Sequence, residues 1–220
     1  MSEAEQIIEA IGLLFATEVM SHSGHANASM RMPGPEPRML LTAQGNVRNL
    51  SASDLALVTF EGEAIEGRLE PVAREIVAMH AAVYRARPDV SSVIHTHSPR
   101  VTSFALAHQP LPCRYEALLR FGVTEDVPVA AWAPRGSKES AANIVEQLTA
   151  HPHTPAVLLA NHGLLAFGAT PMATAQLIIA MEEAAELTLG AQALGPGAQP
   201  FPEGALEQER AHMRRFGSAS

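Results

Sequence analysis

Cysteine is almost absent from the sequence, and this limits where the protein is expected to work. Cys113 is the only cysteine among 220 residues, so no disulfide can form within the chain. A scaffold without disulfides is typical of reducing compartments, and the cytoplasm is the expected location. The first residues, Met1–Glu5, are acidic where a secretory signal is basic, which agrees with that location.

A concentration of positive charge and a long apolar run are missing as well. The 15 lysines and arginines form no long cluster, and the formal net charge is −8, which argues against a nucleic acid partner. No uninterrupted apolar run approaches the roughly 18 residues that span a bilayer, so no membrane partner is expected. With 47% apolar and 17% charged residues, the composition predicts a soluble globular protein.

A glycine-rich phosphate loop after a strand is also missing, which argues against a dinucleotide-binding fold. Apolar runs of strand length alternate with segments of helical periodicity. The expected strands are 39–42, 55–60, 90–97, 127–132, 156–160 and 164–167, and the expected helices are 3–20, 73–85, 98–107, 137–148, 171–194 and 206–215. This mixture predicts one α/β domain over residues 1–220, with a mixed or mainly antiparallel sheet. A Gly- and Pro-rich break near 195–200 is expected to precede a short helical tail.

Histidine, by contrast, is abundant, and two of the ten histidines end an apolar run. His95 and His97 are one residue apart at the end of the segment Val90–His97. In a strand, positions i and i+2 share a face, so the two rings are expected to lie side by side. Core packing gives no reason for this pair, whereas a divalent metal ion does.

Two further residues complete the predicted site. His162 lies where the run 156–160 gives way to a turn, from which a rigid backbone can hold an imidazole at a cleft. Glu75, near the start of the preceding helix, can supply a carboxylate as a further ligand or as a general base. Three protein ligands and one open position are typical of a catalytic zinc site.

Other histidines have simpler interpretations. His151 and His153 have the same spacing as the first pair but lie among Pro and Thr, so they are expected at the surface. His80 falls on the apolar face of its helix, and we expect it to be buried and hydrogen-bonded.

Three motifs carry a resemblance to a known family. MLLTAQG (39–45), YRARPDVSSVIHTHSP (84–99) and ANHGLLAFG (160–168) resemble the class II aldolase/adducin family, which includes sugar-phosphate aldolases, a ribulose-phosphate 4-epimerase and several decarboxylases. The resemblance implies a three-layer α/β/α fold around a mainly antiparallel sheet. It also implies a homotetramer with active sites at the subunit interfaces.

The resemblance implies further that His95, His97 and His162 hold one divalent metal ion per chain. The ion is normally Zn²⁺ in such proteins, although imidazole ligands also suit Mn²⁺, Co²⁺ and Fe²⁺. Glu75 takes the place of the family's catalytic glutamate, although it lies five residues before His80 where the family spacing is four. Tyr115 stands where sugar-phosphate aldolases have a tyrosine that can act as an acid; a partly buried aromatic residue is the alternative interpretation.

The phosphate pocket departs most from the family pattern. Sugar-phosphate aldolases have a Gly-Asn pair, a Pro-Ser-Gly turn and two serines before the glutamate. The positions correspond here to Asn27 after an alanine, to Gln44 and Gly45, and to Arg74 beside an alanine or Glu75. Because small hydroxyl groups that cradle a dianion are gone, a non-phosphorylated substrate is expected. Asn27, Gln44, Gly45 and Arg74 are the expected substrate-binding residues, Arg74 through a bidentate contact to a carboxylate.

The predicted function is that of a metal-dependent carbon–carbon lyase. The favoured reaction is retro-aldol cleavage of a small hydroxy-keto compound through a metal-stabilised enediolate. The first alternative is decarboxylation of a hydroxylated carboxylic acid, with hydroxylated aromatic acids included, because this reaction uses the same electron sink. An iron-dependent oxygenase on this scaffold is another. A non-catalytic module like the adducin head domain is the last, and the resemblance disfavours it because that domain lacks the three histidines.

Overall fold

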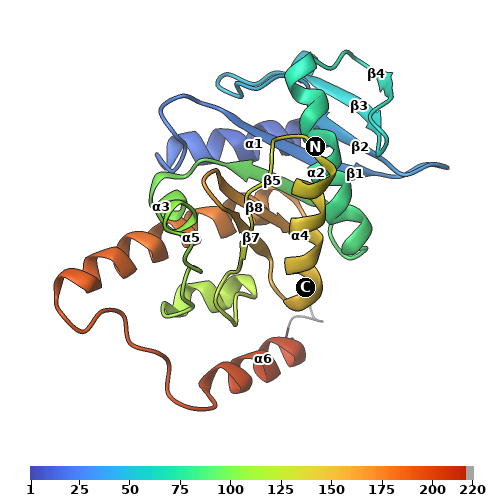
Figure 1. Ribbon diagram of the computed structural model, residues 1–220. Coiled ribbons are helices and arrows are strands. Elements are labelled where there is room, and N and C mark those ends of the chain that lie inside the picture. Colours follow the sequence, from blue (N-terminus) through green and yellow to red (C-terminus); the bar gives the residue numbers. More distant parts are fainter. Residues whose placement is uncertain (217–220) are drawn as a thin grey trace.

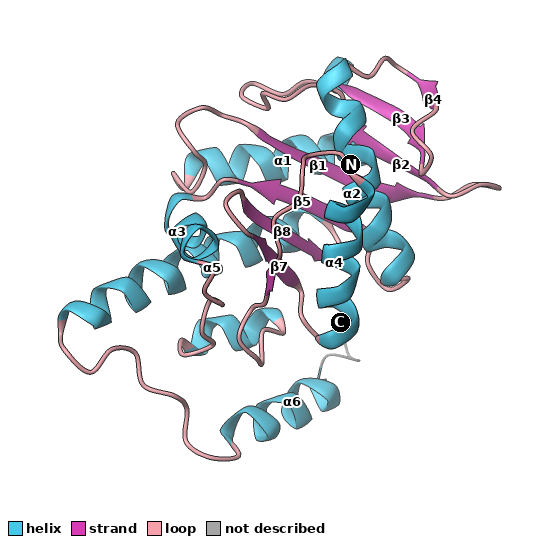
Figure 2. Ribbon diagram, viewed as in Figure 1, coloured by secondary structure: helices cyan, strands magenta, loops and turns pink. Residues whose placement is uncertain are grey.

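The computed structural model describes residues 1–216, which fold around one eight-stranded sheet (Figures 1 and 2). The strand order is β4-β3-β2-β1-β5-β8-β7-β6, and every neighbouring pair is antiparallel except β6 and β7. The strands are β1 (Ala26–Met32), β2 (Arg38–Thr42), β3 (Leu55–Thr59), β4 (Ala64–Glu66), β5 (Ser92–Thr96), β6 (Val129–Ala130), β7 (Ala156–Leu159) and β8 (Gly163–Gly168). The helices are α1 (Glu3–Ala16), α2 (Pro71–Ala86), α3 (Pro99–Ala107), α4 (Lys138–Ala150), α5 (Pro171–Ala193) and α6 (Ala205–Phe216), with 3₁₀ turns η1 (Ala52–Asp54) and η2 (Glu116–Phe121).

Helices cover both faces of the sheet. On one face α2 packs beside α4, and on the other α5 packs against α1 and α3 (Figure 1). Strand β5 shows how the sequence produces two layers of core. Ile94 belongs to the apolar core that includes α1 and α5, whereas the adjacent Val93 belongs to the core that includes α2 and α4. Successive strand side chains point to opposite faces, so a strand covered on both sides is buried throughout. The predicted three-layer α/β/α fold is confirmed.

The starts of α1, α4 and α5 follow the capping rules, whereas α2 and α3 begin without a side-chain capping bond. Ser137 and Thr170 cap α4 and α5 through side-chain hydrogen bonds, as their sequences indicate. Ser98 followed by Pro99 predicts the same capping role at the start of α3, but the side chain of Ser98 makes no capping bond, so that prediction is wrong. The buried carboxylate of Glu182, from α5, accepts hydrogen bonds from the backbone nitrogens of Arg100 and Val101 instead, at 2.8 and 2.9 Å.

Three strands differ from the sequence-based expectation, namely β1, β4 and β6. Strand β4 was not expected, since it consists of three exposed residues. Strand β1 was not expected, because ANASMRM lacks the β-branched residues and the alternation that mark a strand; its pairing with both β2 and β5 makes it one. The strand expected at 127–132 is reduced to the two residues of β6. Helix α6 follows the loop after α5, as expected, but the division of residues 1–220 into a single domain stays a prediction, and residues 217–220 lie outside the described part.

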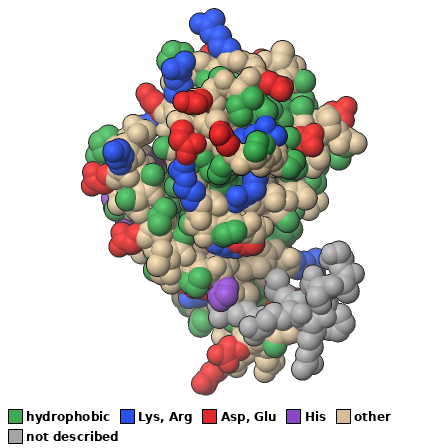
Figure 3. Space-filling model, turned by 90° about the vertical axis from the view of Figure 1, so that its right-hand side faces the viewer, with side chains coloured by type: hydrophobic (Ala, Val, Ile, Leu, Met, Phe, Trp, Pro, Cys, Tyr) green, Lys and Arg blue, Asp and Glu red, His purple; other side chains and the backbone are tan. Residues whose placement is uncertain are grey.

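The described part of the chain has no helix suited to a membrane span and, in the view of Figure 3, no large basic surface area, as the composition indicates. Within residues 1–216, no helix has both the length and the apolar composition that crossing a bilayer requires. On the face drawn in Figure 3, acidic and basic side chains are intermixed with apolar ones, and the basic groups form no continuous area there.

Candidate metal centre and its pocket

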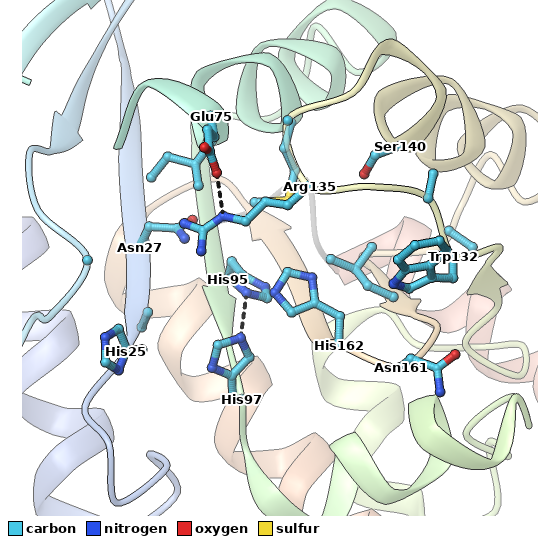
Figure 4. A pocket seen from close by; sticks show the side chains of 18 of the residues that line it. His25, Asn27, Glu75, His95, His97, Trp132, Arg135, Ser140, Asn161 and His162 are labelled. Atoms are coloured by element: carbon cyan, nitrogen blue, oxygen red, sulfur yellow. Dashed lines mark hydrogen bonds and ion pairs between the residues drawn. The ribbon is translucent and has the colours of Figure 1, made fainter. Parts of the chain in front are cut away.

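The three predicted histidines converge on one point. His95 lies in β5, His97 follows that strand, and His162 lies in the turn between β7 and β8. Each offers one ring nitrogen, and these nitrogens lie within 4.8 Å of one another. The Nε2 atoms of His95 and His97 are 3.1 Å apart, and the rings of His95 and His162 have centroids 4.6 Å apart (Figure 4). The convergence follows from the sheet, because β5 and β8 are antiparallel neighbours.

Glycine at position 163 makes this approach possible. A Cβ atom there would lie 2.5 Å from the carbonyl oxygen of Thr96 and 2.9 Å from Cδ2 of His97. Only glycine therefore lets the start of β8 lie so close to β5 and carry His162 to the other two rings. Asn161 has a φ of 57°, in the left-handed region that asparagine tolerates, and its backbone nitrogen donates to Ala105 of α3 at 3.1 Å. The turn expected after the run 156–160 is confirmed, and it joins the antiparallel strands β7 and β8.

A backbone carbonyl fixes which nitrogen of His95 faces the centre. Nδ1 lies 2.8 Å from the carbonyl oxygen of Leu164, so Nδ1 carries the proton and donates it. The lone pair of a neutral ring is then on Nε2, the atom directed at His97. Such a carbonyl partner is a common means of orienting a metal-ligating histidine.

The surroundings keep all three imidazoles neutral. Burial, followed by the neighbouring histidines, lowers the pKa of His95 well below its ordinary 6.5. Burial also lowers the pKa of His97, with smaller effects from His25 and Arg135. Burial, then His97 and Arg135, lowers the pKa of His162 to about 4. Neutral nitrogen ligands at pH 7 are what a divalent ion requires, so this donor set fits a metal with one coordination position left open.

The histidines form the floor of a pocket of about 450 Å³. Figure 4 shows Asn27, Glu75 and Arg135 on one side of the rings and Trp132 with Ser140 on the other. Asn27 pairs directly with His95 across β1 and β5, so the two side chains leave the same face of the sheet. Three of the expected site residues besides the histidines therefore line this pocket, namely Asn27, Gly45 and Glu75.

A buried chain of hydrogen bonds orients Asn27. Nε2 of His80 lies 2.5 Å from Oδ1 of Asn27, and Nδ1 of His80 lies 2.6 Å from Oγ of Ser29, which is 2.8 Å from the hydroxyl of Tyr84. An amide oxygen only accepts, so Nε2 of the neutral His80 donates to it and Nδ1 accepts from Ser29. The amide nitrogen of Asn27 is then the group left to donate into the pocket. The expectation that His80 is buried and hydrogen-bonded is confirmed.

Glu75 makes an ion pair that the sequence did not indicate. Its Oε2 lies 3.2 Å from Nε of Arg135, which belongs to the loop between β6 and α4. The loop is held against Glu75 at the next residue: Gly136 has a φ of 73°, and a Cβ there would lie 3.1 Å from Cβ of Glu75. Arg135, Trp132 and His25 line the pocket and were missed. A glycine after an arginine in a loop was the one available signal, and it is a weak one.

The remaining expected residues lie elsewhere in this chain. Arg74 is exposed on α2 and does not line the pocket, and Gln44 lines a separate hollow beside Arg68. Tyr115 precedes η2, and Glu183 of α5, first by its charge, raises the pKa of the tyrosine hydroxyl. The roles of these three residues stay predictions.

The sequence profile described as the Class II Aldolase and Adducin N-terminal domain matches residues 5–189. The chain belongs to this family. A 5-methylthioribulose-1-phosphate/5-deoxyribulose-1-phosphate aldolase of Rhodospirillum rubrum is 31% identical over 149 residues, which are 67% of this chain and 64% of that protein. The L-ribulose-5-phosphate 4-epimerase UlaF of Salmonella paratyphi A is 28% identical over 76% of this chain and 75% of its own.

A solved structure supports the family membership. An L-fuculose 1-phosphate aldolase matches with a TM-score of 0.84 and 25% identity, over 96% of both chains. The class II aldolase fold is therefore the fold of this chain, as the motifs implied. Helix α6 lies outside the matched residues 5–189, so the family assignment rests on the sheet and helices α1 to α5.

Proposed function

We propose that this class II aldolase family member is a divalent-metal-dependent lyase that cleaves a carbon–carbon bond next to a carbonyl group. One observation carries the proposal: three neutral imidazole nitrogens lie within 4.8 Å of one another on the floor of a pocket that a carboxylate, Glu75, also lines. Zn²⁺ is the proposed ion, with Mn²⁺, Co²⁺ and Fe²⁺ as candidates for the same ligands. A bound ion would supply Lewis-acid stabilisation of negative charge on the substrate carbonyl.

The side chains of the pocket supply the remaining chemistry. In the proposed retro-aldol direction, Glu75 takes the proton of the substrate hydroxyl as the carbon–carbon bond breaks, and the bonding electrons move onto the carbonyl group of the other fragment. Proton return from the same carboxylic acid to carbon completes the reaction. Asn27 donates through its amide nitrogen to a substrate oxygen. Val72, Ile76 and Met79 give the pocket an apolar wall, which strengthens these polar contacts.

The proposed substrate is a small hydroxy-keto compound without a phosphate group. The relatives named above act on phosphorylated sugars, but the residues around the first turn of α2 that line this pocket are Val72 and Ala73. Neither offers a hydroxyl donor to a dianion. Decarboxylation of a hydroxylated acid is the second candidate, since the missing cradle removes the reason to expect a sugar phosphate.

Metal analysis of the purified protein tests the proposal. About one equivalent of zinc, manganese or cobalt per chain is expected, and the double variant His95→Ala/His97→Ala should lose it. The double variant His151→Ala/His153→Ala is the matched control, because it removes a pair of the same spacing that lies outside the pocket. Stoichiometric iron would favour the oxygenase, and no metal even with excess divalent ions would favour a non-catalytic module.

We also propose a homotetramer in the cytoplasm, with Tyr115 acting as an acid in the pocket of a neighbouring subunit. Its position outside the pocket of its own chain supports this arrangement. Sedimentation equilibrium tests the assembly. Mixing the inactive variants Tyr115→Phe and Glu75→Gln tests the sharing, because hybrid tetramers regain activity only where the two residues come from different chains.

A further inference from the structure

Arg135 lies in the pocket, although no sequence motif indicates a role for it. It is the only lysine or arginine among the residues lining the pocket, within the described part of the chain. The preceding loop carries it from the end of β6 towards the first turn of α2, and Figure 4 shows its guanidinium extended between Glu75 and Asn27 over the histidine rings. A cation is thus held in the pocket close enough to lower the pKa of His97 and His162.

The guanidinium group uses little of its hydrogen-bonding capacity. Nε is engaged by Glu75 at 3.2 Å, and one terminal nitrogen, Nη2, lies 3.4 Å from the carbonyl oxygen of Val72, which is long for such a bond. Arginine has five N–H donors arranged to bind two oxygens of one oxyanion at once. The terminal edge of Arg135 is therefore available to a ligand that enters the pocket.

The present ion pair is also easy to exchange. The side chains of Arg135 and Glu75 are 49% and 51% exposed. Ion pairs between such exposed side chains contribute little to the free energy of folding, because water competes for both partners. A substrate oxyanion that enters with its other end at the histidines meets the guanidinium in a less hydrated setting, where a two-point contact is stronger.

We propose that Arg135 is the anchor for a carboxylate at the tail of the hydroxy-keto substrate, and that this carboxylate takes the guanidinium over from Glu75. The inference rests on the proposed function and specifies its substrate as a hydroxy-keto acid. Binding then frees Glu75 for proton transfer only when the correct substrate is present. A carboxylate paired with arginine is stabilised in its ionised form, and carbon dioxide loses that charge. The anchored carboxylate is therefore retained, and the bond cleaved is the aldol bond.

Three probes with the same hydroxy-ketone head and different tails test the anchor on the metal-loaded protein. They are dihydroxyacetone, with a neutral tail, hydroxypyruvate, with a carboxylate, and dihydroxyacetone phosphate. Calorimetry should show that hydroxypyruvate binds about 10- to 100-fold more tightly than dihydroxyacetone, the range for a charged two-point hydrogen bond. Arg135→Gln should reduce this ratio towards one.

Arg85→Gln is the matched control, since Arg85 is an exposed arginine of α2 that also pairs with a glutamate, Glu61, and does not line the pocket. Its ratio should equal that of the unmodified protein. A ratio unchanged by Arg135→Gln means that the metal site itself holds the carboxylate, and it overturns the anchor. Tighter binding of dihydroxyacetone phosphate than of hydroxypyruvate overturns the carboxylate in favour of a phosphate ester. Metal content, measured first, separates the two failures: a protein that loads no metal refutes the proposed function, whereas a loaded protein with an unchanged ratio refutes the anchor alone.

Discussion

The buried His80 should make the protein sensitive to acid by an amount that the structure sets. His80 is fully buried between Asn27 and Ser29, and burial lowers its pKa from 6.5 to about 3. The pKa of His80 is lower in the folded state than in the unfolded chain. Between these two pKa values, the unfolded chain binds a proton at His80 and the folded protein does not. Stability from this residue is therefore complete above pH 6.5 and is lost as the pH falls towards 3.

The magnitude follows from the distance to the ordinary pKa. At pH 4.5, roughly two units below the unfolded value, the loss is about 3 kcal/mol, at about 1.4 kcal/mol for each unit. Glutamine at position 80 does not titrate, and its amide can accept from Ser29 and donate to Asn27. His80→Gln should cost about 1–3 kcal/mol at pH 7.5 through imperfect geometry. This cost should disappear or reverse sign at pH 4.5.

Urea unfolding of the metal-free protein, followed by circular dichroism at both pH values, measures this difference. The charge of His80 is the last of the causes that lower the pKa of His95 and does not act on His97 or His162, so the contribution of these three histidines largely cancels between the two proteins. His153→Gln, a change at an exposed residue, is the control and should run parallel to the unmodified protein. If the His80→Gln curve also runs parallel, with a stability difference that does not depend on pH, the buried neutral His80 is refuted.

Other consequences can be tested with single changes. Gly163→Ala should lower stability by about 1–3 kcal/mol and weaken metal binding, because the added Cβ would meet the Thr96 carbonyl at 2.5 Å; in thermal unfolding, Gly12→Ala in α1, with open space around it, should stabilise instead. Glu75→Gln should keep one metal per chain and reduce kcat by roughly 10²–10⁴-fold in a turnover assay. Burial raises the pKa of Glu182, so its contribution to stability should fall as the pH rises from its unfolded pKa through the higher folded one, and Glu182→Gln should remove this part of the pH dependence of urea unfolding. A chelator should lower the Tm. Metal added back at 100 times its Kd should raise the free energy of unfolding by about 2.7 kcal/mol.

The candidate metal ligands could be predicted from the sequence because their signals are local. The two-residue spacing at the end of a buried strand indicates His95 and His97. The position in a turn between two apolar runs indicates His162. The helices and most strands carry periodicity that reflects burial on one or two sides. Strand β1 carries none, since Asn27 and Ser29 face polar partners rather than apolar core. Only its pairing with β2 and β5 identifies it as a strand.

Contacts between distant segments were not accessible. Arg135 lies 60 positions from Glu75 in the numbering, and no periodicity connects a loop arginine with a helix carboxylate. Glu182 stands in the middle of α5 near Glu183 and Glu186, where an acid is expected to face solvent, yet its carboxylate replaces the cap that a serine before α3 would supply. In both cases the partner is chosen by packing, and packing depends on the whole fold.

The pairing of β1, β5 and β8 gives the metal centre a further property. Asn27, His95 and the start of β8 meet only in one alignment of three strands, and a slip of one residue in β5 would turn His95 to the opposite face of the sheet, towards Ile7 and Met181. A bound metal ion would thus select one alignment among those the backbone hydrogen bonds would allow. During folding, an ion bound between His97 and His162 would join segments far apart in the chain and trap the correctly aligned sheet, so metal supply should influence the yield of folded protein as well as its activity.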